Sequence, residues 1–276
     1  MEQIHLFNNF VKAYLIKKFI RPCGNVLDMA CGKGGDLKKY KHNKVGFYHG
    51  LDIVPERIKE AEVRYKNICC MFAAVFSVSD FTLPLQLSNK YDLISCQFAF
   101  HYAWNDMEKA NQVLANIALH LSTNGYSILT YPDWNVIFSK LKNLERHQDE
   151  YNYHKQNCIR VGGRTYFIQF ETNLPLELFL NKIENNPFGQ QYIYYQQGAI
   201  DGIPEFLVHP QKLREMINAH GLTVHMDCNF NRFLEPDPEW NALRADMHAT
   251  ESLHSESWEI VNLYRALVVS KDQRLG

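Results

Sequence analysis

The chain has 276 residues, 46% hydrophobic and 21% charged, which is enough apolar material for one large core, so we expect a single globular domain with insertions. Its formal net charge of −1 excludes a generally basic coat for nucleic acid, so any phosphate-binding region must be local. Seven cysteines without CxxC or Cys/His finger spacing argue against a disulfide framework and against a zinc site. No apolar run of about 18 residues occurs and the first segment contains lysines, so we expect a soluble intracellular protein that does not contact a membrane.

The first 67 residues alternate between helical and strand-like patterns. Apolar residues from Phe7 to Phe19 recur at helical spacing, and residues 25–30 form a short apolar strand that runs into the turn CGKGGD. A basic helix is expected over 36–44 and a second strand over 45–53. The segment PERIKEAEVRYKN then begins a helix at its proline.

The same alternation continues to residue 131. Residues 69–78 and 91–98 predict two more buried strands, and the apolar face from Ala110 to Leu121 predicts a helix. We expect Asn124-Gly125 to stop that helix and to turn the chain into a strand over 126–131. This order predicts an open, mostly parallel sheet that is covered on both faces and binds ligands at the carboxyl ends of its strands.

The regular pattern breaks between residues 133 and 200. This segment mixes a short helix, polar turns and aromatic strands such as RTYFIQF and QYIYYQQ, and we interpret it as an insertion that forms a substrate lobe. After it, PQKLREMINAHG predicts a helix and LTVHMDCNF a strand. Residues 258–270 predict a final apolar strand that completes the sheet.

A glycine-rich turn and two later acids suggest a nucleotide-like ligand. Asp28 and Gly32 belong to the turn between the first strand and its helix, where glycines allow a close backbone approach and the helix N-terminus attracts negative charge. The compressed G-x-G-G differs from a dinucleotide fingerprint and suits a cofactor with a cationic amino-acid end. Asp52 at the end of the next strand can hold both hydroxyls of a ribose, and Asp80 can accept from the amine of an adenine. The alternative is that these glycines and acids only make turns.

The order of these features resembles the class I S-adenosylmethionine-dependent methyltransferases, whose first motif is matched by VLDMACGKGGD. The resemblance implies a Rossmann-like α/β fold with a seven-stranded, mostly parallel sheet and S-adenosylmethionine as the cofactor. Ala30 stands where that family usually has glycine, so the turn must tolerate a methyl group.

A more specific resemblance is to the mRNA cap guanine-N7 methyltransferases. It is carried by FNNFVKAYLI, LDMACGKGGDLKKY, SCQFAFHYAW, PEFLV at 204–208 and SESWEIVNLY. It implies that the methyl donor is surrounded by Lys12, Asp28, Gly32, Asp52, Asp80 and Gln97. It further implies that the cap guanosine is surrounded by Asn8, Phe98, His101, Tyr102, Pro132, Glu205 and Tyr264, with Lys33 near the phosphates.

The chemistry of guanine fits these residue types. Aromatic side chains such as Phe98 and Tyr264 can stack on the base without choosing among bases, whereas Glu205 can accept from both donors of the guanine edge. Other roles remain open: the His and Tyr of 101–102 can satisfy each other in a buried strand end, Glu205 can serve a helix N-terminus, and Tyr264 can belong to the core. The lysines after Lys33 are expected to lie on a solvated helix face.

The reaction implied by the resemblance needs no general base, because N7 of guanine has a free lone pair. We expect no residue with a direct chemical role, only positioning by Glu205, His101, Tyr102 and Tyr264. We also expect a metal-free monomer that acts on the 5′-capped end of RNA in the nucleus, or in the cytoplasm for a cytoplasmically replicating virus, and that can associate with other capping enzymes or the transcription machinery. The alternatives are a methyltransferase for another RNA position or a small molecule, and an inactive cap-binding relative.

Overall fold

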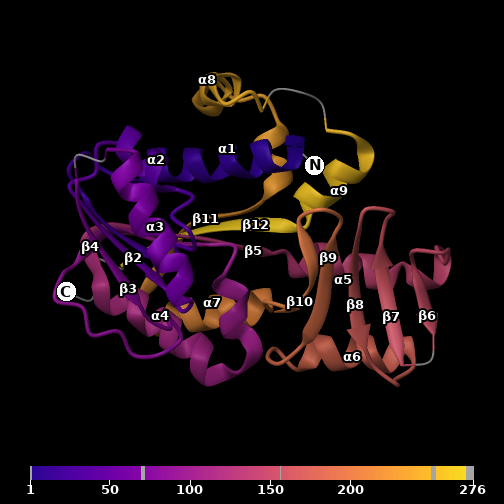
Figure 1. Cartoon of the computed structure of the whole chain (residues 1–276). Helices are drawn as coiled ribbons and strands as arrows, with labels where there is room; N and C mark the ends of the chain where they lie inside the picture. The colour runs from indigo at the N-terminus through magenta and orange to yellow at the C-terminus, as the bar shows by residue number, and fades with distance from the viewer. Residues whose placement is uncertain (1, 70–71, 156, 250–252, 272–276) are drawn as a thin grey trace.

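Seven strands form one sheet, with helices on both of its faces, in the computed structural model, which describes residues 2–69, 72–155, 157–249 and 253–271 (Figure 1). The strand order is β11-β12-β5-β4-β1-β2-β3. Strands β1 to β5 pair in parallel, whereas β12 is antiparallel to both of its neighbours, β5 and β11. The predicted seven-stranded, mostly parallel sheet is therefore confirmed. The strands are β1 (Asn25–Met29), β2 (Phe47–Asp52), β3 (Ala73–Val78), β4 (Tyr91–Gln97), β5 (Leu121–Pro132), β11 (Leu222–Asn229) and β12 (Tyr264–Lys271).

Helices cover the two faces of this sheet as separate apolar layers. Buried side chains of α1 (Glu2–Phe19), α2 (Leu37–His42) and α3 (Pro55–Asn67) belong to one hydrophobic cluster, and those of α4 (Met107–His120) and α7 (Pro210–Ala219) belong to another. Figure 1 shows α1 and α4 on opposite sides of the strands. The remaining helices around this sheet are α8 (Pro238–Asp246), α9 (Ser255–Asn262) and the 3-10 turns η1 (Phe100–Asn105) and η3 (Phe230–Leu234). Within the described ranges, no helix has the length and apolar character needed to span a membrane.

A second, antiparallel sheet with the strand order β10-β9-β8-β7-β6 forms the lobe after β5. Because β10 pairs with β9 from Ile200 to Phe206, this sheet continues past residue 200, where we had placed the end of the insertion. The lobe consists of α5 (Trp134–Lys142), η2 (Leu144–Arg146), β6 (Tyr153–Lys155), β7 (Cys158–Gly162), β8 (Tyr166–Glu171), α6 (Leu176–Asn185), β9 (Gln191–Gln196) and β10 (Ile200–Phe206).

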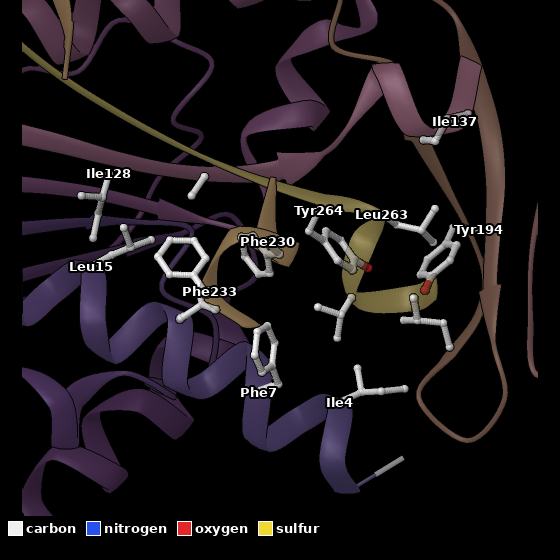
Figure 2. Close-up of a cluster of buried hydrophobic side chains, with 14 of the residues drawn as sticks. Ile4, Phe7, Leu15, Ile128, Ile137, Tyr194, Phe230, Phe233, Leu263 and Tyr264 are labelled. Carbon is white, nitrogen blue, oxygen red and sulfur yellow. The ribbon is translucent and has the colours of Figure 1, made fainter. Parts of the chain in front are cut away.

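One hydrophobic cluster connects the lobe to the main sheet. It includes Phe7 of α1, Ile128 of β5, Tyr194 of β9, Phe230 of η3 and Tyr264 of β12. Figure 2 shows Tyr264 between Phe230 and Tyr194, with Ile4 and Phe7 of α1 below them. Because burial of this apolar surface is shared, the orientation of the lobe is tied to the packing of the main sheet.

Two features of the main sheet differ from the prediction. Strand β3 lies at the edge of the sheet and its residues are half-buried or exposed, so it is not the buried strand expected over 69–78; residues 70 and 71 of that range lie outside the described residues. Helix α4 ends at His120 and β5 begins at Leu121, so Asn124-Gly125 lies inside the strand and does not stop the helix. Gly125 lies where the pairing with β4 shifts register, and a Cβ there would be 2.8 Å from the carbonyl oxygen of Tyr91.

The predicted strand over 258–270 is wrong in its first part. Residues 255–262 form helix α9, and the strand starts only at Tyr264. The apolar pair Ile260 and Val261 fits either secondary structure, and both side chains are buried in the cluster that also contains α1. Helix α9 packs against α1, and this tertiary contact selects the helix.

Candidate active site

In the glycine-rich turn after β1, every second residue from 30 to 34 has a positive φ: Ala30 (63°), Gly32 (55°) and Gly34 (70°). A Cβ on Gly34 would lie 2.6 Å from a methyl carbon of Leu37 and 3.3 Å from Ala61, so only glycine fits there. At Ala30 the turn does tolerate a methyl group, although the left-handed conformation is unfavourable for alanine. The backbone N–H of Gly32 donates to Oδ2 of Asp52 over 2.8 Å, which joins the turn to the end of β2.

A cavity of about 420 Å³ opens beside this turn at the carboxyl ends of the strands. Asp52, Asp80 and Gln97 line it, as predicted for one site. Asp52 is 3% exposed and accepts from the backbone N–H groups of Gly32 and Val54. The amide nitrogen of Gln97 is buried without a hydrogen-bond partner, while its oxygen accepts from a threonine hydroxyl. A buried donor of this kind is costly unless a ligand accepts from it.

Asp80 is held in its orientation by the residue two positions later. Its Oδ1 accepts from both the backbone N–H (2.8 Å) and the hydroxyl (2.7 Å) of Thr82. Among the described residues, both hydrogen bonds to Asp80 go to Oδ1, so Oδ2 remains available as an acceptor. The carboxylate can therefore receive an exocyclic amine at the wall of the cavity.

A larger cavity of about 610 Å³ lies next to the first. Six of the residues predicted for the acceptor line it, together with Lys12. They come from four parts of the chain that are far apart in sequence, namely α1, the junction of β4 with η1, β10 and β12. The six are Asn8, Phe98, His101, Tyr102, Glu205 and Tyr264.

Glu205 is 5% exposed and is oriented by a neighbouring strand. The hydroxyl of Tyr192 on β9 donates to its Oε2 over 2.7 Å. Its Oε1 is 3.6 Å from Nε2 of His101, which is too long for a hydrogen bond. Both ring nitrogens of His101 are buried without a hydrogen-bond partner, as is Oδ1 of Asn8. The larger cavity thus presents several unpaired polar atoms, an arrangement expected of a site that is completed by a polar ligand.

Aromatic rings form the walls around these polar groups. Phe98 and Tyr264 meet edge to face with ring centroids 4.9 Å apart, and the rings of His101 and Tyr102 are 4.3 Å apart. Phe98 has a positive φ of 56°, and its backbone N–H is held by Thr130. A non-glycine residue in that conformation is strained and is often found at functional sites.

The two cavities share a wall. Phe98 and Tyr102 line both of them, so groups bound in the two cavities would meet at these rings. Burial, together with the nearby carboxylate of Glu205, raises the pKa of Tyr102 to about 12, so its hydroxyl stays protonated at neutral pH and can donate a hydrogen bond.

Other predicted residues lie outside the lining of both cavities. Asp28 is buried and accepts from the hydroxyl of Tyr48 (3.0 Å), and burial together with the nearby Asp36 raises its pKa to about 8. Gly32 acts through the bond to Asp52 described above. Pro132 ends β5 as the register partner of Tyr264. The side chain of Lys33 is 57% exposed and forms an ion pair with Glu60 (3.1 Å).

The lysines near the turn divide into paired and solvated groups. Lys12 lines the larger cavity, not the smaller one that contains Asp52, and its Nζ is 2.9 Å from Asp36. The expectation that every lysine after Lys33 lies on a solvated face is wrong for Lys39. Its side chain is only 12% exposed, and it donates to Asp36 and Asn9 because the helix turns it toward α1.

Several residues around the cavities were missed, among them Tyr192 and Arg57. Tyr192 orients Glu205, and the alternation of QYIYYQ is the signal that places Tyr192 and Tyr194 on one face of the strand. Arg57 lines the smaller cavity from the first turn of α3, and the sequence offers no signal for this, because solvent-exposed arginines are common there.

Comparison with known proteins identifies the family of the chain. The profile of the mRNA (guanine-N(7))-methyltransferase domain family matches residues 1–272. The chain is similar to "mRNA cap guanine-N(7) methyltransferase 1" of Arabidopsis thaliana, with 29% identity over 97% of this chain and 75% of that protein. It is also similar to "mRNA cap guanine-N(7) methyltransferase" of Saccharomyces cerevisiae, with 32% identity over 85% of this chain, and to that of Cryptococcus neoformans, with 29% identity over 96%. The chain spans 54% and 43% of the length of these two relatives.

Solved structures agree with the fold. An S-adenosylmethionine-dependent methyltransferase of Clostridium acetobutylicum superimposes with a TM-score of 0.55 at 12% identity, covering 97% of this chain and 92% of that one. A putative S-adenosylmethionine-dependent methyltransferase of Listeria monocytogenes superimposes with a TM-score of 0.58 at 13% identity, covering 98% and 99%. These likenesses establish the Rossmann-like methyltransferase fold, and the profile match over nearly the whole length shows that the chain belongs to the mRNA (guanine-N(7))-methyltransferase domain family.

Proposed function

We propose that this protein transfers a methyl group from S-adenosylmethionine to N7 of the terminal guanine of 5′-capped RNA. The observation that carries the proposal is the position of Glu205, a buried carboxylate in an aromatic cavity that shares Phe98 and Tyr102 with a second, acid-lined cavity. The names of the similar proteins support the same acceptor.

The smaller cavity fits the adenosine half of the donor. Asp52 can accept from the two ribose hydroxyls, Asp80 can accept from the adenine amine, and the unpaired amide N–H of Gln97 offers a donor. When bound, S-adenosylmethionine supplies a methyl carbon made electrophilic by a positively charged sulfur. In our proposal Lys12 and Asp28 act around this site indirectly, through the ion pair to Asp36 and through the buried base of the turn.

The larger cavity fits a guanine. Among the described residues, none donates a hydrogen bond to Oε1 of Glu205, and Oε2 retains a second lone pair beside the hydroxyl of Tyr192. The carboxylate can therefore accept from both N–H groups of the guanine edge. The unpaired ring nitrogens of His101 lie beside it, and the nitrogen that carries the proton can donate to the guanine carbonyl. Adenine would leave these buried groups without partners, which is the usual basis for rejecting a similar ligand.

The chain's own contribution to the reaction is orientation. N7 of guanine needs no deprotonation, so Phe98, Tyr102 and Tyr264 act by holding the ring so that its lone pair faces the neighbouring cavity. Proximity of this kind can supply about 7 to 11 kcal/mol of the barrier. The two cavities together therefore account for the transfer without a residue that carries protons.

The direct test is methyl transfer to the dinucleotide GpppA with radiolabelled donor, followed by digestion and separation of N7-methylguanosine. We expect label on N7 of the cap guanine and none with ApppA. Transfer to another position, or only to a small molecule, would show that N7 of the cap guanine is not the acceptor. Donor binding without any transfer would favour an inactive cap-binding relative. We further propose that the enzyme acts without a metal and as a monomer on nascent transcripts in the nucleus, or in the cytoplasm for a cytoplasmic virus, where other capping enzymes can associate with it.

A further inference from the structure

A column of stacked side chains stands on the outer face of the second sheet, away from the cavities. Along β8 and β9 the side chains alternate: Tyr166, Ile168 and Phe170 are buried, whereas Phe167 and Tyr195 are half-buried on the opposite face. Helix α6 packs against the inner face, where Phe179 meets Phe170. In Figure 1 the strands β6 to β9 lie in front of α5 and α6, so their other face is uncovered.

The members of this column, Tyr153, Arg160, Phe167 and Tyr195, are arranged in sequence across β6 to β9. The rings of Phe167 and Tyr195 are stacked, with centroids 4.9 Å apart and planes 14° apart. The guanidinium of Arg160 lies 3.7 Å from the centroid of Phe167 and 5.9 Å from that of Tyr153. Lys155 continues the row, with its Nζ 4.2 Å from the Tyr153 ring.

The cations of this column are held by rings and not by acids. Within the described part of the chain, neither Arg160 nor Lys155 forms an ion pair, and Nε of Arg160 is buried without a hydrogen-bond partner. Glu171 lies on the same face of β8 as Phe167. Burial raises the pKa of the nearby Cys158 thiol, Glu171 raises it further, and Arg160 and Lys155 lower it. Cations that form no ion pair with the described residues, next to flat rings, match a polyanion with flat bases.

The end of the column formed by Tyr195 lies next to β10, a strand whose inner face lines the larger cavity. Tyr195 is the member nearest β10, and the pairing between these strands shifts between Ile200 and Ile203, so residues 201 and 202 bulge opposite it. Gly202 has no side chain to cover the ring, and both residues are exposed. On the inner face, Gln196 and Ile203 of the same two strands line the larger cavity. A chain leaving that cavity around the β9–β10 hairpin would reach the outer ring of Tyr195.

From this geometry we propose that the column binds single-stranded RNA downstream of the cap, with a base stacked on the free face of Tyr195 and phosphates near Arg160 and Lys155. This inference rests on the proposed function. It adds a second contact with the RNA, which does not depend on the base sequence. It explains how a chain with a net charge of −1 can hold RNA through one local surface.

Steady-state kinetics with two acceptors test this. Wild-type protein should show a lower KM for a capped RNA of about ten nucleotides, a length within the usual site size, than for GpppA. In Tyr195→Ala the KM for capped RNA should rise about tenfold, the loss expected for one stacked base, while kcat and the constants for GpppA stay unchanged. Tyr195→Phe keeps the ring and should behave as wild type, and Lys59→Ala removes an exposed lysine on α3 as a charge control.

Direct binding separates the two proposals. Fluorescence anisotropy with an uncapped single-stranded RNA should show affinity that Tyr195→Ala and Arg160→Gln both reduce, and this readout does not depend on methyl transfer. A wild-type KM in Tyr195→Ala, or no difference between GpppA and capped RNA in the wild type, overturns the column as an RNA site. Failure to methylate GpppA, with RNA binding intact and sensitive to Tyr195, instead overturns the proposed reaction alone.

Discussion

Replacing Glu205 by Gln is the sharpest test of the proposal that this carboxylate accepts hydrogen bonds from the guanine N–H groups. Gln has the same shape and keeps an oxygen that can accept from Tyr192, so the fold of this buried position should survive. The substitution replaces one carboxylate oxygen by an NH₂ group that faces the donors of guanine. A hydrogen bond to a charged acceptor contributes about 1.5 to 3 kcal/mol, and an opposed pair of donors adds to that loss. We therefore expect a loss of about 3 kcal/mol of transition-state stabilisation, which is a fall of about 150-fold in kcat/KM for GpppA.

An altered acceptor makes this measurement specific. Inosine lacks the 2-amino group of guanine, so wild-type protein should use IpppA less well than GpppA by the loss of one hydrogen bond to Glu205. In Glu205→Gln the ratio of the two kcat/KM values should move toward one, because the group that distinguishes them is gone. Calorimetry should show unchanged affinity for S-adenosylmethionine, because Glu205 lines only the larger cavity. An unchanged ratio in the variant would refute the assignment of Glu205 to the guanine edge, whatever the absolute rate.

Three further predictions concern the donor side and the phosphates. Asp52→Ala should weaken donor binding measured by calorimetry, because the carboxylate both faces the cavity and holds the N–H of Gly32; wild-type affinity would contradict this. In donor-free protein the raised pKa of Asp28, about 8, means that the folded state binds more protons than the unfolded state between about pH 4 and 8. The free energy of unfolding should therefore fall with rising pH through that window, by at most about 1.4 kcal/mol per unit, and urea titrations should show a flatter profile for Asp28→Asn. Lys33→Ala should slow transfer to GpppA more than transfer to guanosine at low salt if the lysine leaves Glu60 for the phosphates, and equal effects on both acceptors would remove that role.

The local pattern of the sequence accounts for the main sheet because each of its units carries its own signal. Strand β1, the glycine turn and α2 follow from apolar periodicity and from glycines that must take positive φ, and α3 begins at its proline as expected. Asp52 and Gln97 end their strands and Asp80 follows one, so the topology of a parallel sheet alone brings them to one edge.

The grouping of the residues that line the larger cavity could not be predicted from local sequence patterns. The sequence contains Glu205, Tyr264 and Asn8, and the resemblance to a family groups them, but no periodicity connects residues that lie so far apart along the chain. Only the packing of the lobe against α1 and β12 surrounds the cavity with them, and only the pairing of β9 with β10 sets Tyr192 against Glu205.

What the sequence determined by itself is thus everything that depends on neighbours along the chain: the alternation of strands and helices, the turn that requires glycine at 34, and the acids at the ends of strands. The tertiary structure alone decided that residues 255–262 are helical, that β3 lies at an edge, that Lys39 turns inward and that Lys33 pairs with Glu60. The physical reason is that these outcomes depend on which surfaces become buried against each other, and burial energy comes from contacts between segments whose meeting no local pattern records.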